Sequence, residues 1–421
     1  MQRILFAFTL MVVCSWHGLR AEPESAAEGW PQWRGPLATG TAPKAQPPLT
    51  WSEEENIRWK MAIPGTGHST PIVWGDRVFV TTAVDTEHQA DPETIKAVED
   101  ATPRFHRDTA RMPRNTVRFV VLALNRADGE ILWQRTVTER VPHEGTHADG
   151  SWASGSPVTD GTSVYAYFGS FGLYALDAAT GKVRWEKPFG PFSIKANFGE
   201  GTSPVLHRNR LIVCQDHEEQ SFIVALDTDT GKEVWRRQRD EGTAWATPLV
   251  VEHNATVQVI ASAANRIRAY DLRSGDVLWH TTGMTANVIP SPVANDDLVF
   301  CMSGFRGAAL VAVRLDEARG DLAENPDAIA WTRDQGTPYV PSPLLYNNNL
   351  YFFRGNRAVL TCLDAAAGTP HYENQRLEGM RMVYPSPVGA AGRVYVTGRR
   401  GLTLVLEAGP AFRILAKNRL H

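Results

Sequence analysis

One short pattern recurs along the chain and limits the folds that the chain can adopt. Residues 175–185 are Ala-Leu-Asp-Ala-Ala-Thr-Gly-Lys-Val-Arg-Trp, and residues 225–235 are Ala-Leu-Asp-Thr-Asp-Thr-Gly-Lys-Glu-Val-Trp. In each copy an apolar run meets a turn in which Gly can adopt a positive φ and Asp can accept backbone hydrogen bonds. A short run ending in Trp follows, so the pattern predicts a β-hairpin. Weaker copies occupy residues 123–133, 269–279 and 362–372.

A second repeated element, Ser or Thr followed by Pro, precedes these hairpins. We call its copies the Ser/Thr-Pro anchors; they begin at Thr70, Ser156, Ser203, Thr247, Ser291, Ser342 and Ser386. After the first, longer interval they recur about every 44–50 residues, with four short strand-like runs in each unit. Such a period indicates a β-propeller, whose four-stranded blades surround a channel. We therefore expect an all-β fold of four-stranded antiparallel blades with seven full repeats.

The number of blades is open at this point. Residues 56–63 look like the last strand of a blade, with Trp59 at the Trp position of the repeat, but no hairpin partner precedes them. Either the ring has seven blades and an extra edge strand, or it follows an eight-bladed plan that is incomplete at the C-terminus. We favour the second arrangement, because a propeller usually closes by joining strands from both ends of the chain.

The N-terminal residues 1–21 have the features of a secretory signal. Arg3 precedes an apolar run over residues 4–13, and Ala21 supplies a plausible cleavage site. Lipid modification at Cys14 is an alternative, although a small residue usually precedes a lipidated cysteine. No segment reaches the roughly 18 continuous apolar residues of a membrane-spanning helix. The sequence therefore predicts an exported protein, periplasmic or extracellular, with no transmembrane segment.

Composition and the positions of Pro and Gly divide the remaining chain into segments. We expect residues 22–50, rich in Pro and Gly, to dock on the propeller surface, and residues 51–421 to form a single propeller domain. Residues 85–118 form a charged insertion that we expect to be a long loop with a helical turn. The formal net charge is −3, with 43 basic and 46 acidic residues, so nothing favours nucleic acid as a partner. Cys214, Cys301 and Cys362 fall in different repeats and are expected to be buried free thiols.

The Ala-x-Asp-x-x-Thr-Gly-Lys-x-x-Trp pattern resembles the tryptophan-docking repeat of the pyrroloquinoline-quinone (PQQ)-like β-propellers. The resemblance covers about residues 51–415, and the start Trp30-Pro31-Gln32-Trp33 looks like that of exported bacterial members. It implies that the repeat Trp of each blade packs on the neighbouring blade. The residues expected in this docking role are Trp59, Trp133, Trp185, Trp235, Trp279 and Trp331.

The resemblance implies two classes of function. Quinoprotein dehydrogenases of this family carry PQQ and Ca²⁺ at the channel mouth, whereas a second branch resembles the lipoprotein B subunit of the outer-membrane barrel assembly machinery and holds no cofactor. The sequence contains no adjacent pair of cysteines, and no motif match transfers the calcium ligands. We therefore expect no cofactor, with PQQ and calcium as the less favoured alternative.

The candidate site residues fall in the loops between repeats. His143, His147 and Asp149 form the densest set of possible metal ligands, yet Pro142, Gly145 and Gly150 indicate a loop with no third ligand in helical register. Residues 216–219 are expected to form a solvated turn, and Arg399 and Arg400 a surface turn. The weak candidates for a binding face are His68, Trp152, Trp245 and Tyr384.

No catalytic triad, phosphate-binding glycine loop or paired-cysteine motif accompanies the repeats. We therefore expect a non-catalytic scaffold that binds a protein partner, an envelope component or a ligand through one face of the disc. A PQQ/calcium-dependent dehydrogenase is the first alternative. The second is a carbohydrate- or polymer-binding module that uses exposed aromatic residues, for which the candidates are Trp152, Phe168, Phe171, Trp245 and Tyr384.

Overall fold

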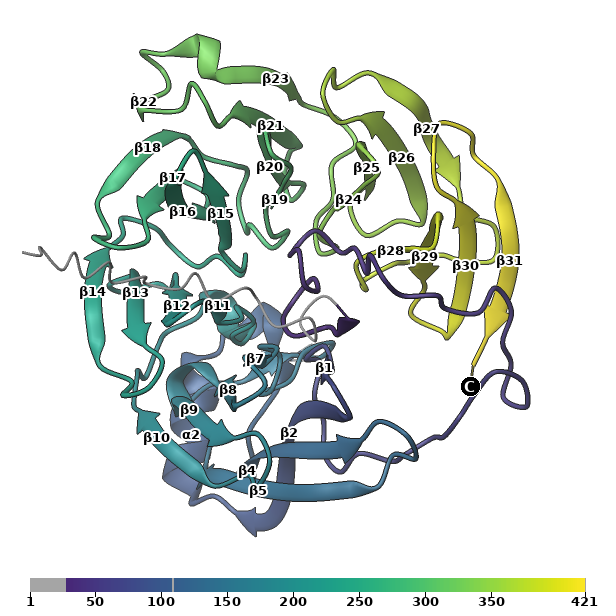
Figure 1. Cartoon of the computed structure of the whole chain (residues 1–421). Helices are drawn as coiled ribbons and strands as arrows, with labels where there is room; N and C mark the ends of the chain where they lie inside the picture. The colour runs from purple at the N-terminus through teal and green to yellow at the C-terminus, as the bar shows by residue number, and fades with distance from the viewer. Residues whose placement is uncertain (1–27, 108–109, 421) are drawn as a thin grey trace, which may run out of the picture.

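The computed structural model describes residues 28–107 and 110–420, and the expected signal and Cys14 lie outside these residues. It shows seven blades of four antiparallel strands each, arranged in a ring around a central axis, and one blade gains a fifth, parallel strand (Figure 1). The predicted all-β propeller is confirmed. Among the described residues, no helix has the length and apolarity that crossing a membrane requires.

Each blade runs from an inner strand at the channel to an outer strand at the rim (Figure 1). Blade 1 contains β1 (Ile72–Trp74), β2 (Arg77–Gln89), β4 (Asn115–Asn125) and β5 (Ile131–Arg140). Blade 2 contains β7 (Val158–Thr159), β8 (Ser163–Tyr167), β9 (Leu173–Asp177) and β10 (Val183–Lys187). Blade 3 contains β11 (Val205–His207), β12 (Arg210–Gln215), β13 (Phe222–Asp227) and β14 (Glu233–Gln238). Blade 4 contains β15 (Leu249–His253), β16 (Thr256–Ser262), β17 (Arg266–Asp271) and β18 (Val277–Thr282).

The same order continues in the second half of the chain. Blade 5 contains β19 (Val293–Ala294), β20 (Leu298–Ser303), β21 (Ala309–Arg314) and β23 (Ile329–Arg333). Blade 6 contains β24 (Leu344–Tyr346), β25 (Asn349–Phe353), β26 (Val359–Asp364) and β27 (Pro370–Arg376). Blade 7 contains β28 (Val388–Ala390), β29 (Arg393–Thr397), β30 (Leu402–Glu407) and β31 (Ile414–Arg419). The short helices outside the blades are α2 (Pro92–Ala101), η1 (Arg104–His106), η2 (Gly169–Phe171), η3 (Lys195–Asn197) and η4 (Pro326–Ala328).

The hairpin turns of the repeat have the geometry that their sequence predicts. In blade 2 the Asp177 carboxylate accepts hydrogen bonds from the backbone N–H of Thr180, at 3.0 Å, and from its hydroxyl, at 2.9 Å. Gly181 follows with a φ of 67°. That left-handed conformation favours glycine because the residue has no Cβ.

The repeat Trp of one blade lies on the turn of the next blade. The indole N–H of Trp185 donates to the Thr228 carbonyl at 2.8 Å, and its ring covers Gly231 so closely that a Cβ there would lie 2.6 Å from Cε3. Trp133, Trp235 and Trp331 make the equivalent contacts on Gly181, Gly275 and Gly368. Trp279 is fully buried, but its indole donates to Gln258 of its own blade.

The hydrophobic core is divided among the spaces between blades. Six clusters of buried apolar side chains are present, and each joins two consecutive blades. Within the described part of the chain, no such cluster joins blade 7 to blade 1. The three cysteines, Cys214, Cys301 and Cys362, are buried in this core as free thiols.

A segment that we call the N-terminal plug, residues 30–42, occupies the centre of the ring (Figure 1). Trp30 pairs with Val73 of β1, and Thr41 pairs with Gly389 of β28. Arg34 is 3% exposed and donates to the carbonyls of Pro343 and Pro387 at 2.8 and 2.9 Å. The plug therefore connects the inner strands of blades at both ends of the chain.

A second segment, the strap of residues 47–66, crosses from blade 7 to blade 1 (Figure 1). At blade 7 the Asn418 side chain donates to the Leu49 carbonyl at 3.0 Å and accepts from the Trp51 N–H at 3.0 Å. At blade 1 the Trp59 indole donates to the Arg126 carbonyl at 2.9 Å. The Trp59 ring also covers Gly129, where an added Cβ would lie 2.5 Å from Cε3 of the ring. Trp59 thus makes the contact that a preceding blade would make.

The expectation that residues 56–63 form a blade strand is wrong, because this stretch has no sheet partner. The charged insertion holds the helix α2 where a helical turn was expected. It also contains β3 (Ala110–Arg111), which pairs with β6 (Thr146–His147) beyond the insertion, so the insertion is more ordered than a long loop. The connection between β21 and β23 of blade 5 contributes a further strand, β22 (Gly320–Asp321), which pairs in parallel with β18 of the neighbouring blade.

Residues 216–219 were expected to be a solvated turn, and for the first two this is wrong. Asp216 and His217 are 3% and 4% exposed. The Asp216 carboxylate accepts two hydrogen bonds from Arg239, at 2.7 and 3.0 Å. Arg239 is also buried, so the pair is an internal ion pair between the residues that directly follow β12 and β14 of blade 3.

Candidate functional site

A cavity of about 540 Å³ lies at the mouth of the channel, and we call it the channel cavity. The N-terminal plug contributes Trp30, Trp33 and Arg34 to its wall. The plug pairs with Val73 and Gly389, the middle residues of β1 and β28, whereas most of the residues that line the cavity precede the inner strands. The plug therefore closes the channel on one side of the cavity.

The Ser/Thr-Pro anchors form one tier of the cavity wall, and all seven hydroxyl residues line it. Hydrogen bonds connect anchors of consecutive blades, from the backbone N–H of one anchor to the side-chain oxygen of the next. The N–H of Thr70 donates to Ser156 Oγ at 2.9 Å, and the N–H of Ser156 donates to Ser203 Oγ at 2.9 Å. The series continues from Ser203 to Thr247, from Ser291 to Ser342 and from Ser342 to Ser386. These bonds fix the inner strands relative to one another around the channel.

The residues two positions before the anchors form a second tier. Every one of them lines the channel cavity: His68, Ser154, Gly201, Trp245, Ile289, Val340 and Tyr384. Because an antiparallel blade brings each connection back to the same end of the channel, equivalent positions converge there. Their side chains differ from blade to blade, so this tier gives the cavity its chemical character.

The cavity wall combines aromatic and polar groups. Trp245, Phe198 and Tyr339 provide aromatic surface, while Asn356 and His147 provide hydrogen-bonding groups. The Trp245 indole donates to the Gly199 carbonyl at 2.7 Å, which fixes the ring at the wall. Aromatic walls with a few placed polar groups are typical of ligand-binding pockets.

An ionic group lies at the rim of the channel cavity. Asp149 accepts from the Arg399 guanidinium, and the Arg399 guanidinium also lies 4.6 Å from the centre of the Tyr384 ring. The pKa of His68 is lowered, first by burial and then by Arg111 and Arg399, against the opposing effect of Asp149. His68 is therefore a neutral imidazole at pH 7, able to donate one hydrogen bond and accept another.

Glu200 brings an acid into the cavity wall. Burial raises its pKa to about 8, although the backbone N–H and the hydroxyl of Ser170 donate to its carboxylate at 2.8 and 2.6 Å. Glu144 lies nearby, and burial raises its pKa to about 7. At neutral pH, Glu200 is therefore largely protonated and presents an uncharged carboxyl group.

The structure brings some predicted site residues together and separates others. His68, His147, Asp149, Trp245 and Tyr384 share the channel cavity. The other predicted residues lie outside it: His143 bonds to the Phe192 carbonyl at 2.9 Å, and the Trp152 indole donates to the Glu144 carbonyl at 3.0 Å. Phe168 and Phe171 are buried in the core between blades 1 and 2, so neither is available as a binding aromatic.

The cavity residues do not fit a calcium site. Ca²⁺ prefers about six to eight oxygen ligands, several of them carboxylates. The two acids of the cavity, Asp149 and Glu200, are engaged by Arg399 and Ser170. In residues 28–107 and 110–420, no group of three or more His, Cys, Asp or Glu side chains is arranged to hold a metal ion.

Sequence reasoning missed Tyr339, Phe198, Glu200 and the plug residues of the cavity. The anchor spacing held a usable signal, because the position two residues before each Ser or Thr always faces the cavity. That rule identifies Trp245 and Tyr384 directly. It does not find Glu200, which is placed by its bonds to Ser170, thirty positions earlier in the chain.

Comparison with known proteins agrees with the fold. A family model described as Outer membrane protein assembly factor BamB matches residues 117–374. A polyvinylalcohol dehydrogenase from Sphingopyxis sp. (strain 113P3) is 25% identical over 53% of this chain and 34% of its own length. An outer membrane protein assembly factor BamB from Francisella salina is 31% identical over 23% of this chain and 17% of its own length. The matches thus span about a third or less of these relatives.

Solved structures share the architecture at low sequence identity. BamB from Moraxella catarrhalis has a TM-score of 0.51 and 15% identity, covering 73% of this chain and 91% of its own. A quinohemoprotein alcohol dehydrogenase from Comamonas testosteroni has a TM-score of 0.52 and 14% identity, covering 91% and 77%. These likenesses concern the fold alone, whereas the family model covers more than half of the sequence. The chain belongs to the PQQ-like repeat β-propeller family described as Outer membrane protein assembly factor BamB.

Proposed function

We propose that this chain is an exported β-propeller that binds a ligand or a segment of a partner protein in the channel cavity and catalyses no reaction. The supporting observation is the second tier of the cavity, where seven equivalent positions carry seven different residue types. Such a wall recognises shape and hydrogen bonding, and it provides no nucleophile paired with a base. The match to an assembly factor makes an envelope protein the favoured partner.

The proposal includes export by the leader at residues 1–21 and a single propeller domain over residues 51–421, with residues 22–50 docked upon it. The location is therefore periplasmic or otherwise outside the cytoplasm. The N-terminal plug closes one end of the channel, so the cavity is a blind pocket and not a passage. A ligand enters from the face that carries the blade connections.

Blocking the cavity tests this proposal. Ile289 lines the cavity at the second tier, and Ile289→Trp adds bulk there, whereas Val277→Trp adds the same group at an exposed site on β18. Immobilised wild-type protein and both variants are exposed to cross-linked envelope extract, and captured proteins are quantified. We expect Ile289→Trp to reduce capture at least about tenfold and Val277→Trp to leave it within about twofold.

The enzymatic alternative is tested on the same preparation. Wild-type protein is incubated with PQQ and Ca²⁺, and both absorbance and dye-linked oxidation of alcohols and sugars are recorded. Stoichiometric quinone retention together with oxidation would overturn the non-catalytic proposal. Equal capture by all three proteins would overturn the placement of the binding site in the cavity.

A second candidate, polymer or carbohydrate binding, is favoured by one observation. Trp245 and Tyr384, together with Tyr339, gather at one cavity, where their rings can pack on sugar or polymer faces. Titration with maltohexaose and with short polyvinyl alcohol distinguishes this candidate. Saturable binding that Ile289→Trp abolishes supports it, and binding unaffected by that change rejects it.

A further inference from the structure

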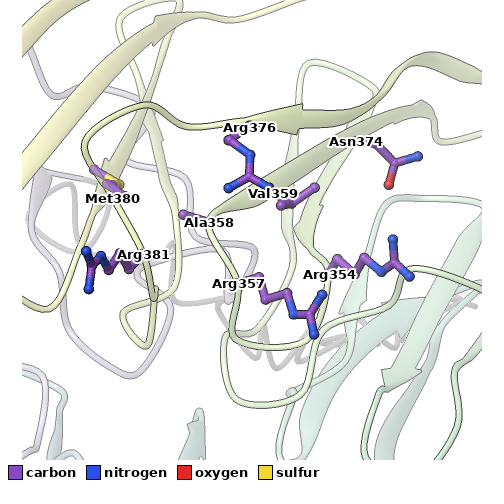
Figure 2. A pocket seen from close by; sticks show the side chains of 8 residues that line it. All are labelled: Arg354, Arg357, Ala358, Val359, Asn374, Arg376, Met380 and Arg381. Atoms are coloured by element: carbon purple, nitrogen blue, oxygen red, sulfur yellow. The ribbon is translucent and has the colours of Figure 1, made fainter.

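Four arginines surround a second pocket, of about 500 Å³, on blade 6 (Figure 2). Arg354 and Arg357 lie in the loop between β25 and β26, Arg376 ends β27, and Arg381 lies in the connection to blade 7. We call this the arginine pocket. All four side chains are exposed, and no acidic residue lines the pocket.

The nearest acids on this part of the chain are engaged elsewhere. Glu373 pairs with Arg333 at 2.5 Å, and Glu378 pairs with Lys417 at 3.9 Å. Among the ion pairs of the described residues, none includes any of the four pocket arginines. Four arginines thus line one pocket that has no acidic lining residue, on a protein whose formal net charge is −3.

The loops that carry the arginines are fixed relative to each other. Arg357 and Met382 form an isolated backbone bridge, and the Ala358 N–H donates to the Arg381 carbonyl at 3.4 Å. Within the first loop, the Arg354 N–H donates to Val359 at 3.0 Å. The backbone therefore fixes the points from which these arginine side chains extend, which removes the cost of ordering the loops when a ligand binds.

We propose that the arginine pocket binds a phosphate-bearing ligand with at least two anionic groups. Guanidinium groups match phosphate oxygens with two parallel hydrogen bonds, and such charge-assisted bonds are stronger than neutral ones. Several separated guanidinium groups are neutralised by a multivalent oxyanion and only poorly by single carboxylates. Val359 and Met380 add apolar wall, so the ligand has an organic portion beside its phosphate groups.

Inorganic pyrophosphate is the first probe, with binding to the full chain measured by isothermal titration calorimetry at low and physiological salt. We expect saturable binding that weakens with salt, because exposed charges are screened. Arg354→Gln/Arg357→Gln removes two pocket charges. Arg273→Gln/Arg314→Gln is the matched control, since both of those residues are exposed on other blades and lie outside the pocket.

We expect the pocket variant to bind pyrophosphate at least about tenfold more weakly and the control to stay within about twofold. Arg354→Lys/Arg357→Lys keeps the charge but loses the planar fork, so its affinity falls between the two. Thermal unfolding of each variant verifies its fold. If the first pocket variant unfolds, Arg376→Gln/Arg381→Gln serves in its place.

Flotation with vesicles distinguishes the source of the phosphate. Binding to phosphatidylglycerol but not phosphatidylcholine vesicles, lost in the pocket variant, supports a lipid headgroup; binding to pyrophosphate alone supports a free phosphate compound. Equal weakening in pocket and control variants would overturn the proposal. So would binding only to a polyglutamate peptide, or no binding to any of these probes.

Discussion

At the scale of single residues, the structure pairs five of the six docking Trp residues, all except Trp279, with a Gly that cannot be replaced freely. Gly231 adopts a φ of 67°, and a Cβ there would meet the Trp185 ring at 2.6 Å. Gly392 adopts a similar φ of 71°, but nothing lies within 4 Å of its Cβ position. Substituting Gly392 therefore tests backbone strain alone, whereas substituting Gly231 tests backbone strain together with steric crowding by the Trp185 ring.

We expect Gly231→Ala to lower the free energy of unfolding more than Gly392→Ala does. Both substitutions place a Cβ at positive φ, which costs about 1 kcal/mol. Only Gly231→Ala displaces an indole ring, and overpacking adds about 1–3 kcal/mol. Denaturant midpoints of the two variants measure the difference. Equal destabilisation would show that the Trp is not held tightly on the turn.

Glu200 predicts a pH dependence of stability. Its pKa in the folded chain is about 8 against an ordinary value of 4.5, so between these pH values the folded state holds more protons. The free energy of unfolding therefore falls as pH rises through this window. Between about pH 6 and 8 we expect a loss of about 1–2 kcal/mol from this group, since one pKa unit corresponds to about 1.4 kcal/mol.

Glu200→Gln should reduce that slope and make the variant more stable than the wild type at pH 8. Thermal unfolding at several pH values checks the prediction, with Glu252→Gln as a control on an exposed carboxylate that pairs with Arg208. Glu144 contributes a slope of the same sign and remains in the variant. An unchanged slope in Glu200→Gln would contradict the raised pKa.

At the scale of elements, the sequence predicts those features that depend only on neighbouring residues in the chain. The hairpins were predictable because the Asp177 and Gly181 turn needs only neighbouring residues. The buried pair of Asp216 and Arg239 was not, because its two members are 23 positions apart and each belongs to a polar stretch. β22 was also missed, since two residues that pair in parallel with another blade carry no strand pattern of their own.

The candidate site was predictable in part for the same reason. His68, Trp245 and Tyr384 lie next to repeated anchors, so the repeat itself marks their position. The arginine pocket assembles residues from two connections and one strand end, and none of these stretches is a basic run. Its charges meet only when blade 6 is folded, so no window of sequence shows them together.

At the scale of the whole molecule, seven blades and a strap complete the ring. Six core clusters join consecutive blades, while blade 7 and blade 1 are connected through the strap and the plug. The strap places Trp59 where a blade between them would place its repeat Trp. The sequence anticipated an eight-bladed plan, and the structure shows seven sheets with Trp59 docked on blade 1.

Closure by the strap predicts a site of proteolysis. Arg58 and Lys60 flank Trp59 and are both exposed, so trypsin can cleave there when the strap detaches. Trp59→Ala removes the docked ring at a cost of about 2 kcal/mol, which raises the detached population more than about tenfold. We expect cleavage at these bonds to accelerate accordingly, as followed by mass spectrometry.

Trp59→Phe keeps an aromatic ring on Gly129 and is expected to be cleaved at an intermediate rate. Leu132→Ala, at an exposed position on β5, is a control that should leave the rate unchanged. If Trp59→Ala remains folded and is cleaved no faster than the wild type, the strap is held by its contacts with blade 7 instead. Those contacts are the bonds of Asn418 to Leu49 and Trp51.

The strap and plug also impose an order on biogenesis. Arg34 bonds to Pro387 across 353 positions, and Trp51 bonds to Asn418 across 367. During synthesis, these N-terminal groups are therefore made long before their partners, and blades 1 to 6 can form while the plug still lacks its contacts with blade 7. Arg34 lacks its Pro387 acceptor until the chain has reached blade 7, and Trp51 lacks Asn418 until β31 has emerged. Ring closure of the propeller is therefore the last step of folding, and it depends on residues that were translated first.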